Sequence, residues 1–464
     1  MMLFSESLCI KLQKESIDLN HKIRQLRCFK VLDTLFKVDI SVGFPSIFKC
    51  QYDLKAFYRL INNKAVEQQD FISGYQKGLE QYSQATLGQK PWILIQDSMF
   101  VDFNTRQVDL GYTQTPNSNG FMLHHGLLLD DHFLPLGLYH QEVFFRERAN
   151  FGKAKQHKSR KLEDKESMKW VNGIESGVRF TEKTGRPVIH IMDREGDVSD
   201  VINYGFNSNQ SFVIRARHDR STLNHTQRDR LKDLEKYRLF QLMRDSKQKK
   251  KVLHRLRNAK GEYYEASCYL HVQKLSFRGI KSPVYCVWLK EITKKNIQGV
   301  EWFLLTDIET QTNQEALNII ELYSKRWTIE DFHKCYKTGC SIEKRQFDSR
   351  KTLANIIALL ALPAVVLLRS RYFATTDPTL SIQKIIRNKE TITIIQKLAD
   401  KYLKPVDLTL CKKNTALWWI LLLGRMGGHQ GFKQKGMPGW QTIWKGYVYF
   451  LQITEMNQFL ANST

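Results

Sequence analysis

Three acidic residues that lie far apart in the sequence have the chemistry of metal ligands. Asp97 and Asp193 each end a short apolar run, ILIQD and IHIMD, and Glu330 lies in the charged segment YSKRWTIEDFHKCYK. An ionised acid at the tip of a buried strand is costly unless it is used or paired. Mg²⁺ prefers carboxylate oxygens, and two such ions about 4 Å apart can activate a water and stabilise a leaving oxygen. The three acids are candidate metal ligands, although a turn or cap role stays open for Asp97 and Asp193.

Four polar side chains around Glu330 recur at helical spacing. Arg326, Glu330 and Lys337 follow Tyr323 by three, seven and fourteen positions, so their directions fall within roughly 60° at about 100° per residue. Glu330 can bind metal, and Arg326 can clamp a phosphate with both arms of its guanidinium. Lys337 can hold another phosphate as a point charge, and Tyr323 can donate to one. The alternative is a solvated helix face with an i,i+4 ion pair between Arg326 and Glu330.

The elements that would position these residues follow an α/β pattern. The two runs that end on acids predict strands, and FMLHHGLLLD, FLPLGLYHQEVFF and SFVIRARH predict three more. KESMKWVNGIESGVRFTEK predicts a helix that ends at Gly185, with Pro187 beyond it. The order predicts a mixed sheet of about five strands with helices, which is the plan of the ribonuclease-H-like fold, with carboxylates at strand ends.

The rest of the chain predicts three regions. Residues 1–75 indicate a small helical DNA-binding region, or equally a solvated helix face, made basic by Arg24, Arg27, Lys30, Lys55 and Arg59. Residues 76–374 would form the catalytic domain, interrupted at 220–305 by an inserted β-subdomain. A long helix is expected there from about Thr312 to Lys337, with an apolar helix near Leu353–Leu368 packed behind it. Residues 375–464 predict a helical, aromatic-rich region.

Charge points to a polyanionic partner. The 464 residues carry 71 Lys and Arg against 47 Asp and Glu, a formal net charge of +24 spread over the whole chain. Such an excess favours nucleic acid, with an anionic membrane surface as the main competitor. The most apolar run, Ile356–Leu368, is shorter than the roughly 20 residues of a spanning helix and contains Pro363, so a buried core helix is expected. No signal peptide is expected, and eight cysteines without a CxxC pair favour reduced thiols in the cytoplasm.

Several ordered motifs resemble a known family. The spacing Tyr-x2-Arg-x3-Glu-x6-Lys from Tyr323 resembles the signature of DDE-type bacterial insertion-sequence transposases of the insertion-sequence-four family, most closely the transposon-five branch. The likeness also covers AFYRLINN, ILIQDS, KESMKW, IMDREGD, FVIRARH and EWFLLTDIE, and LLLGRMGGHQGFKQKGMPGWQTIWKG resembles the family's C-terminal segment. It spans most of the chain and is weak in the first 40 residues and in the insertion.

The resemblance implies a role for each matched residue. Asp97, Asp193 and Glu330 would be the catalytic triad that binds two Mg²⁺ ions, with Mn²⁺ as a substitute. The DNA-binding residues would be Tyr323, Arg326, Lys334, Lys337 and Arg215. Trp302 would stack on a base flipped out of the duplex, which suits an aromatic face, although a core tryptophan is the alternative.

The resemblance also implies an activity. The family carries out cut-and-paste DNA transposition: water nicks one strand at the transposon end, the freed 3′-hydroxyl forms a hairpin, a second water opens it, and the 3′-hydroxyl attacks target DNA. Double-stranded DNA would be the partner, a homodimer would join two ends through the C-terminal region, and the protein would be cytoplasmic and associated with the bacterial nucleoid, away from any membrane. Two alternatives are a metal-dependent DNA nuclease of the same fold without strand transfer and a non-catalytic DNA-binding regulator.

Overall fold

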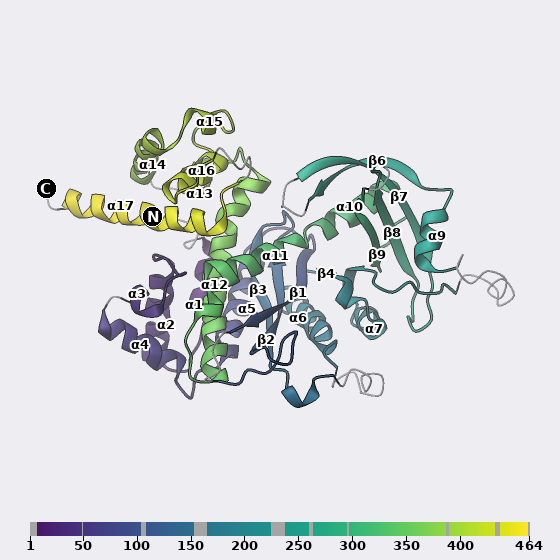
Figure 1. The fold of residues 1–464 in the computed structure, drawn as a ribbon, viewed down its shortest axis with the longest axis horizontal. Coiled ribbons are helices and arrows are strands. Elements are labelled where there is room, and N and C mark those ends of the chain that lie inside the picture. Colours follow the sequence, from purple (N-terminus) through teal and green to yellow (C-terminus); the bar gives the residue numbers. More distant parts are fainter. Residues whose placement is uncertain are drawn as a thin grey trace.

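One mixed sheet runs through a computed structural model of the chain, and helices from both ends of the chain gather to one side of it (Figure 1). This mixed α/β architecture agrees with the predicted fold class at that level. The structure describes residues 7–48, 50–103, 108–152, 165–223, 237–258, 263–294, 297–386, 389–431 and 437–462.

Nine strands form the sheet, in the order β3-β2-β1-β4-β5-β9-β8-β7-β6. β4 pairs in parallel with both β1 and β5, and all other neighbours are antiparallel. The strands are β1 (Trp92–Asp102), β2 (Gly120–Leu129), β3 (Pro135–Phe144), β4 (Val188–Met192), β5 (Ser211–Arg215), β6 (Lys250–Arg257), β7 (Tyr263–Leu275), β8 (Val284–Glu291) and β9 (Glu301–Thr306).

The region predicted as an inserted β-subdomain continues this sheet. β6, β7 and β8 lie within 220–305, and β9 joins them to β5 through the antiparallel pair Ile214–Leu305. The five strands predicted for the core are present as β1 to β5, but the strands of the insertion extend the same sheet to nine and do not form a separate subdomain sheet. Without β9, the edge of β5 that faces away from β4 would leave backbone groups unpaired, and the antiparallel pairing with β9 satisfies them.

β1 is longer than the sequence predicted. A strand ending at Asp97 was expected, whereas β1 continues to Asp102, which pairs with Gly120 of β2. Beyond the acid, Met99 and Val101 alternate as buried residues, the pattern of a half-buried antiparallel strand. The parallel pairing with β4 stops earlier, at Ile95. Asp97 thus lies inside a strand but beyond the end of its parallel neighbour.

The long helix predicted around Glu330 is broken into shorter segments: α10 (Asn313–Ser324), α11 (Trp327–Lys334) and the π-helical turn η6 (Cys335–Gly339). At the junction of α10 and α11, the backbone N–H of Arg326 bonds the Tyr323 carbonyl three residues back, which is the tighter 3₁₀ geometry. The single-helix geometry expected for the four polar residues is therefore wrong, because the axis is interrupted between Tyr323 and Glu330 and again before Lys337.

Two helices agree closely with those predicted from the sequence. α6 (Met168–Thr184) ends at Gly185, whose φ of 72° is the left-handed C-cap conformation that glycine favours. α12 (Arg350–Thr376) contains the apolar run and its interior is buried. Pro363 cannot donate a backbone hydrogen bond within α12. The hydroxyl of Tyr75 in α5 lies 3.0 Å from the Ala358 carbonyl and 3.5 Å from that of Leu359, the acceptor that Pro363 leaves unused.

One helix in the described part of the chain, Arg350–Ala374, has the length and apolarity to cross a membrane. In this structure 89% of its most apolar stretch is buried by other parts of the protein. Figure 1 shows α12 between the sheet and the terminal helices, as expected of a core helix. The prediction of a buried core helix is confirmed.

The remaining helices flank the sheet. At the N-terminal end they are α1 (Leu8–Glu15), α2 (Lys22–Leu35), α3 (Phe44–Ile47), α4 (Gln51–Ile61) and α5 (Gln68–Gln84). Short elements between residues 76 and 374 are η2 (Arg148–Asn150), η5 (Arg194–Gly196), α7 (Ser199–Asn207), α9 (Leu239–Asp245) and η7 (Ile342–Lys344). The C-terminal helices are α13 (Ile382–Ile385), α14 (Lys389–Tyr402), α15 (Pro405–Leu408), α16 (Ala416–Met426) and α17 (Trp440–Asn462). Both terminal regions are helical, as predicted.

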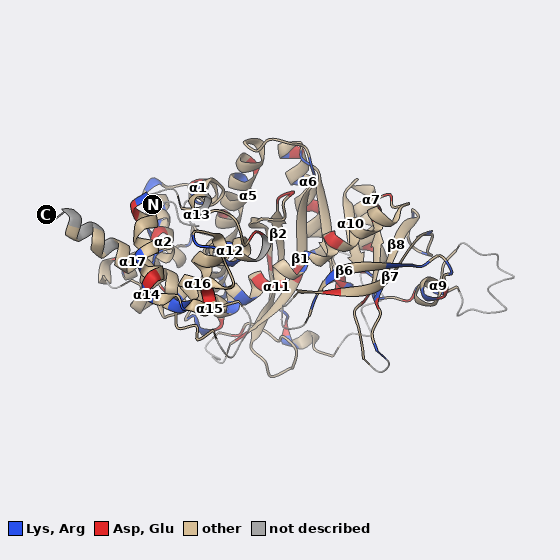
Figure 2. Ribbon diagram, turned by 90° about the horizontal axis from the view of Figure 1, so that it is seen from above, with Lys and Arg blue, Asp and Glu red and all other residues tan. Residues whose placement is uncertain are grey.

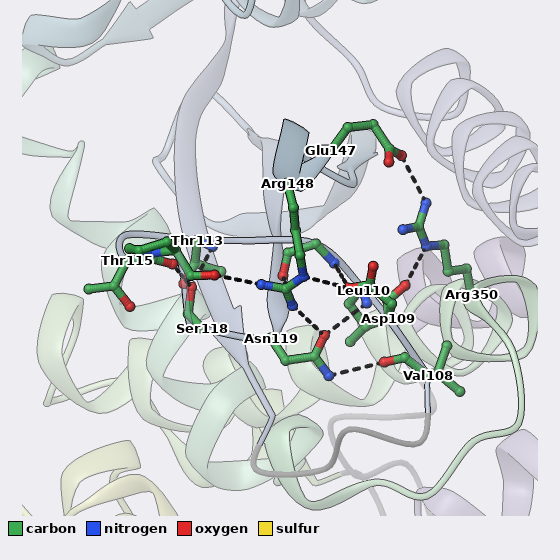
Figure 3. A network of polar contacts seen from close by, with 12 residues as sticks. Val108, Asp109, Leu110, Thr113, Thr115, Ser118, Asn119, Glu147, Arg148 and Arg350 are labelled. Carbon is green, nitrogen blue, oxygen red and sulfur yellow. Dashed lines mark hydrogen bonds and ion pairs between the residues drawn. The ribbon is translucent and has the colours of Figure 1, made fainter. Parts of the chain in front are cut away.

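Polar contacts fix the loop that follows β1 (Figure 3). The Nε of Arg148 lies 3.0 Å from the Asp109 carboxylate, and its Nη1 lies 2.7 Å from the Pro116 carbonyl. Arg350, at the start of α12, donates to the Asp109 carbonyl at 2.8 Å and approaches Glu147 at 3.3 Å. These contacts tie the described part of the β1–β2 connection to the start of α12.

Candidate active site

Asp97 and Asp193 lie at the same level of the sheet. Asp97 is in β1, and Asp193 directly follows β4. The last parallel pair between these strands joins Ile95 to Ile191, and each acid comes two residues later. Adjacent strands are about 4.8 Å apart, and residues two positions on point to the same face. Both acids therefore lie at the carboxyl end of the two parallel strands.

Arg326 connects these acids to Glu330. It is the N-cap residue directly before α11, and its Nη2 lies 2.6 Å from the Glu330 Oε1. Its Nη1 lies 3.9 Å from the Asp97 Oδ2. The charge of Arg326 also acts on Asp193, where it opposes the rise in pKa that burial causes. One guanidinium thus interacts with three acids from three separate elements.

The acids carry more negative charge than Arg326 balances. Burial raises the pKa of Asp97 to about 7, and the charge of Asp193 adds to the rise while Arg326 opposes it. Burial also raises the pKa of Asp193, although the backbone N–H of Glu195 donates to its Oδ1 at 2.8 Å. That bond is the turn role that the sequence left open for Asp193. A further cation beside these acids would favour their ionised forms.

The donor set fits a hard divalent cation. Oxygen ligands from carboxylates are what Mg²⁺ and Mn²⁺ accept, and the buried, incompletely balanced charge of Asp97 and Asp193 suits a cation. Within the described ranges, no group of three or more His, Cys, Asp or Glu side chains stands close enough together to hold a metal ion. Glu330 instead turns to the guanidinium of Arg326. Glu330 must therefore leave Arg326 for the three acids to share a metal.

Two of the side chains predicted to grip phosphate, Tyr323 and Arg215, lie beside Arg326. Tyr323 is only 2% exposed, and its hydroxyl lies against Arg215 of β5, whose charge lowers the Tyr323 pKa while burial raises it. The Nε of Arg326 is a buried donor without a hydrogen-bond partner among the described residues. A buried donor without a partner is costly, so this nitrogen is suited to an incoming acceptor such as a phosphate oxygen.

Lys334 and Lys337 follow Glu330 in the sequence, at the end of α11 and in η6. Lys334 approaches Asp331 at 3.6 Å and its side chain is 56% exposed. Lys337 lies in the π-helical turn and pairs with Glu343 at 3.1 Å. The structure thus brings Tyr323, Arg326 and Arg215 together, and it directs both lysines to partners outside the acid cluster.

Trp302 lines a large basic cavity. Its ring, 7% exposed in β9, meets Tyr323 edge-on with ring centroids 5.2 Å apart. The cavity has a volume of about 1070 Å³, and Arg194, the neighbour of Asp193, lines it. Its other arginines and tryptophans are Arg215, Arg217, Arg244, Arg257, Trp302 and Trp327. An opening with several guanidinium groups and two indoles beside the acids suits a phosphate chain and a planar base.

Sequence reasoning missed several residues of this site. Trp327 and Arg257 line the cavity, and the Arg257 guanidinium lies 5.5 Å from the Trp327 ring. His333, on α11, points its Nδ1 at the Asp97 Oδ2 from 4.0 Å. It packs against His125 of β2. His333 could have been noticed in the sequence, because it lies in the HKCYK segment beside Glu330. His125 could not, because only the pairing of β1 with β2 places it directly opposite Asp97.

Both histidines are neutral in this environment. Burial, Lys337 and Arg326 together lower the pKa of His333 to about 3. Burial and the neighbouring His333 hold the pKa of His125 well below its ordinary value. Each ring therefore carries a single proton and donates from one nitrogen only.

No protein-family model matches this sequence. The geometry and chemistry of the site are therefore the basis for inferring its function. That site consists of two acids on neighbouring parallel strands, a third acid on α11, and a shared arginine beside a basic, aromatic cavity.

Proposed function

We propose that this protein is a cut-and-paste DNA transposase, which nicks transposon ends, forms a hairpin and transfers the ends into target DNA. The observation that carries the proposal is the contact of Arg326 with both Asp97 and Glu330, at the sheet edge that Asp193 shares. It joins acids that are separated by more than two hundred residues of sequence. The resemblance of the Tyr323–Lys337 segment to DDE transposases agrees with this arrangement.

The sheet order supports a ribonuclease-H-like core. β1 stands between antiparallel β2 and parallel β4, and β5 follows β4 in parallel. Carboxylates at the end of β4 and inside β1 then lie at the edge where an α/β sheet presents catalytic groups. The fold alone would serve many activities, so the proposal depends on the acids and their neighbours.

Asp97, Asp193 and Glu330 would hold Mg²⁺ or Mn²⁺. When bound, two such ions supply an activated water and charge stabilisation for the leaving oxygen. The carboxylates orient the site, and Arg326 releases Glu330 as it moves its guanidinium to a DNA phosphate. Arg215 and Tyr323 lie beside Arg326 and provide further donors to the same backbone. Burial excludes water from these contacts and strengthens them.

The basic cavity would accept the strand that bends back during hairpin formation. A flipped base needs an aromatic face, and Trp302 and Trp327 line the cavity together with arginines that can bind phosphates. The net charge of +24 attracts the rest of the duplex. Figure 2 shows lysines and arginines at both the helical end and the strand end of the molecule, as a long DNA footprint requires. Two protomers would hold two ends through the C-terminal helices.

The test is a strand-transfer assay with paired duplexes taken from the DNA that flanks the coding sequence, a supercoiled target plasmid, and Mg²⁺ or Mn²⁺. We expect nicked ends, hairpins and joined plasmid products. Asp97→Asn should abolish all three, whereas the matched control Glu182→Gln, an exposed acid on α6, should leave them unchanged. Cleavage without joining under either metal would favour the nuclease, and specific binding without cleavage would favour the regulator.

A further inference from the structure

Two buried hydrogen bonds and one longer polar contact connect β3 to the acid cluster in one chain. Gln141 of β3 lies 3.0 Å from the Nε2 of His125, through its amide nitrogen. The Nδ1 of His125 lies 3.1 Å from the Nε2 of His333. The Nδ1 of His333 then faces the Asp97 Oδ2 at 4.0 Å. The chain thus passes from one strand, across a second, to a helix and back to β1.

The direction of this chain is set by Tyr336. A phenol has one proton, and the Tyr336 hydroxyl donates it to the Ile357 carbonyl of α12. The hydrogen bond between Gln141 and Tyr336 therefore needs the amide N–H₂ of Gln141 as donor. Gln68 donates to the Gln141 carbonyl oxygen at 3.3 Å, which agrees with the same amide orientation. Gln141 presents its N–H₂ group, and not its oxygen, to His125.

The tautomers of both histidines follow from this orientation. The Nε2 of His125 accepts from Gln141, so the single proton of this neutral ring is on Nδ1. That proton is donated to the Nε2 of His333, which leaves the His333 proton on Nδ1. The distance of 4.0 Å to Asp97 is about 1 Å longer than an N–H···O hydrogen bond, so a hydrogen bond needs the two side chains to approach further.

We propose that His333 is a positioning residue for Asp97, and that Gln141 and His125 fix its tautomer so that an N–H faces the carboxylate. The inference rests on the proposed function, because Asp97 is the acid that it positions. The Oδ1 of Asp97 already accepts from the backbone N–H of Ser98 at 2.8 Å. A donor at Oδ2 fixes the second oxygen, and partners of this kind set the orientation and affinity of metal-ligating carboxylates. The reverse tautomer would place a nitrogen lone pair against the carboxylate.

The first test determines the tautomer directly. In protein labelled with ¹⁵N on the imidazole nitrogens, the signals of His333 are identified by their loss in His333→Asn. We expect the proton on the Nδ1 of His333, and the same assignment for His125. A proton on the Nε2 of His333 overturns the proposal. This measurement needs no metal, DNA or activity, so it is independent of the proposed function.

The second test uses two substitutions of similar size. The asparagine amide nitrogen can stand in for Nδ1, and the glutamine amide nitrogen for Nε2. His333→Asn should therefore keep the affinity for Mn²⁺ and the nicking rate within about threefold, whereas His333→Gln should lose about 10- to 100-fold in both. Equal losses in the two variants would mean that His333 acts only through packing. His271→Gln, at another buried histidine on β7, serves as the control and should change neither quantity.

A third variant reverses the direction of the hydrogen bonds from Gln141, the residue farthest from Asp97. Gln141→Glu replaces the N–H₂ donor with an acceptor, so the proton of His125 moves to Nε2 and that of His333 follows. We expect a loss of Mn²⁺ affinity like that of His333→Gln, with the thermal unfolding curve showing a folded protein. If the Mn²⁺ affinity and the His333 tautomer are both unchanged, Gln141 does not fix the tautomer of His333 and the proposal is contradicted. If Asp97→Asn leaves nicking intact, the proposed function fails, whereas indistinguishable His333 variants with an Asp97-dependent reaction defeat only this inference.

Discussion

Asp97 and Asp193 occupy equivalent positions on two neighbouring parallel strands, each two residues beyond the Ile95–Ile191 pair. This relationship makes the two acids neighbours regardless of the 95 residues between them. Burial, together with repulsion from the neighbouring Asp193, raises the pKa of Asp97 to about 7. An arrangement that is unfavourable for folding is typical of a site that binds a cation or an anionic substrate with its counter-ions.

The first prediction concerns the acid on α11. Glu330→Gln keeps the shape of the side chain and removes its charge, so DNA binding should stay within about threefold while nicking falls at least about 10³-fold. Gel-shift and single-turnover nicking assays measure the two effects. Glu321→Gln, an acid on α10 that pairs only with Lys325 among its described ion pairs, is the matched control. Nicking near the wild-type rate in Glu330→Gln would remove Glu330 from the catalytic set.

The second prediction is a pH dependence of stability caused by Asp97. Its folded pKa is about 7, above the ordinary value of 3.8, so its stabilising contribution is fully present below about pH 4 and is lost as pH rises through 7. In the absence of metal, wild-type protein should lose on the order of 2–4 kcal/mol relative to Asp97→Asn between pH 5 and pH 8. Denaturant unfolding at the two pH values measures the difference. If stability changes with pH in the same way in both proteins, the pKa of Asp97 is not raised in the folded protein.

The third prediction separates the steps of the reaction at Trp302. Trp302→Ala removes the aromatic face in the basic cavity, which is worth about 1–3 kcal/mol for a stacked base. Hairpin formation should slow by about 5- to 100-fold while the first nick changes little, and Trp302→Phe should recover much of the loss. Quenched time courses on a labelled end duplex resolve the two products. Equal losses at both steps would indicate a structural tryptophan.

The fourth prediction concerns the C-terminal helices. Arg425 of α16 donates twice to the Asp407 carboxylate, at 2.8 Å each, and both side chains are 4% exposed. Arg425→Met leaves Asp407 buried without its partner and should destabilise the protein by about 3–5 kcal/mol. The exposed pair of Lys413 with Asp400 is the control, and Lys413→Met should cost less than about 1 kcal/mol. Thermal unfolding compares the two variants, and equal effects would contradict a structural role for Arg425.

The same ion pair has a pH signature. Burial raises the pKa of Asp407, but the hydrogen bonds from Arg425 and from the backbone N–H of Lys404, together with the charge of Arg425, leave the pKa below its ordinary value. The stabilisation is therefore present above the ordinary pKa of an aspartate and is lost as pH falls through the lowered pKa. Arg425→Met should remove this acid sensitivity, which denaturant titrations at pH 3 and pH 6 detect. An unchanged acid response in the variant would assign it to other carboxylates.

Local signals in the sequence predicted the elements that depend on local chemistry. α6 ends at Gly185 because glycine accepts a left-handed cap, and β4 ends before Asp193 because its apolar run ends there. The extension of β1 beyond Asp97 and the addition of β6 to β9 to the sheet were missed, because pairing between distant segments decides both. The break at Arg326 was missed for a related reason, since helix periodicity continues across it.

The candidate site divides in the same way. The chemistry of four side chains can be named from the sequence: those of Asp97, Asp193, Glu330 and Arg326. The structure places the three acids around the guanidinium of Arg326. His125 lies in an unremarkable apolar strand, and only its position opposite Asp97 and its contact with His333 give it a function. Lys337 was expected on the same helix face as Glu330, but the π-helical turn directs it to Glu343.

The central claim is that Asp97, Asp193 and Glu330 form one metal site that serves DNA cleavage and joining. Its most direct test is the binding of Mn²⁺, followed by electron paramagnetic resonance, to the wild-type protein with an end duplex and to the Asp97→Asn, Asp193→Asn and Glu330→Gln variants. We predict that each variant weakens Mn²⁺ binding by at least about 10-fold, because each removes a charged ligand. Wild-type affinity in any one of the three variants would contradict a shared site.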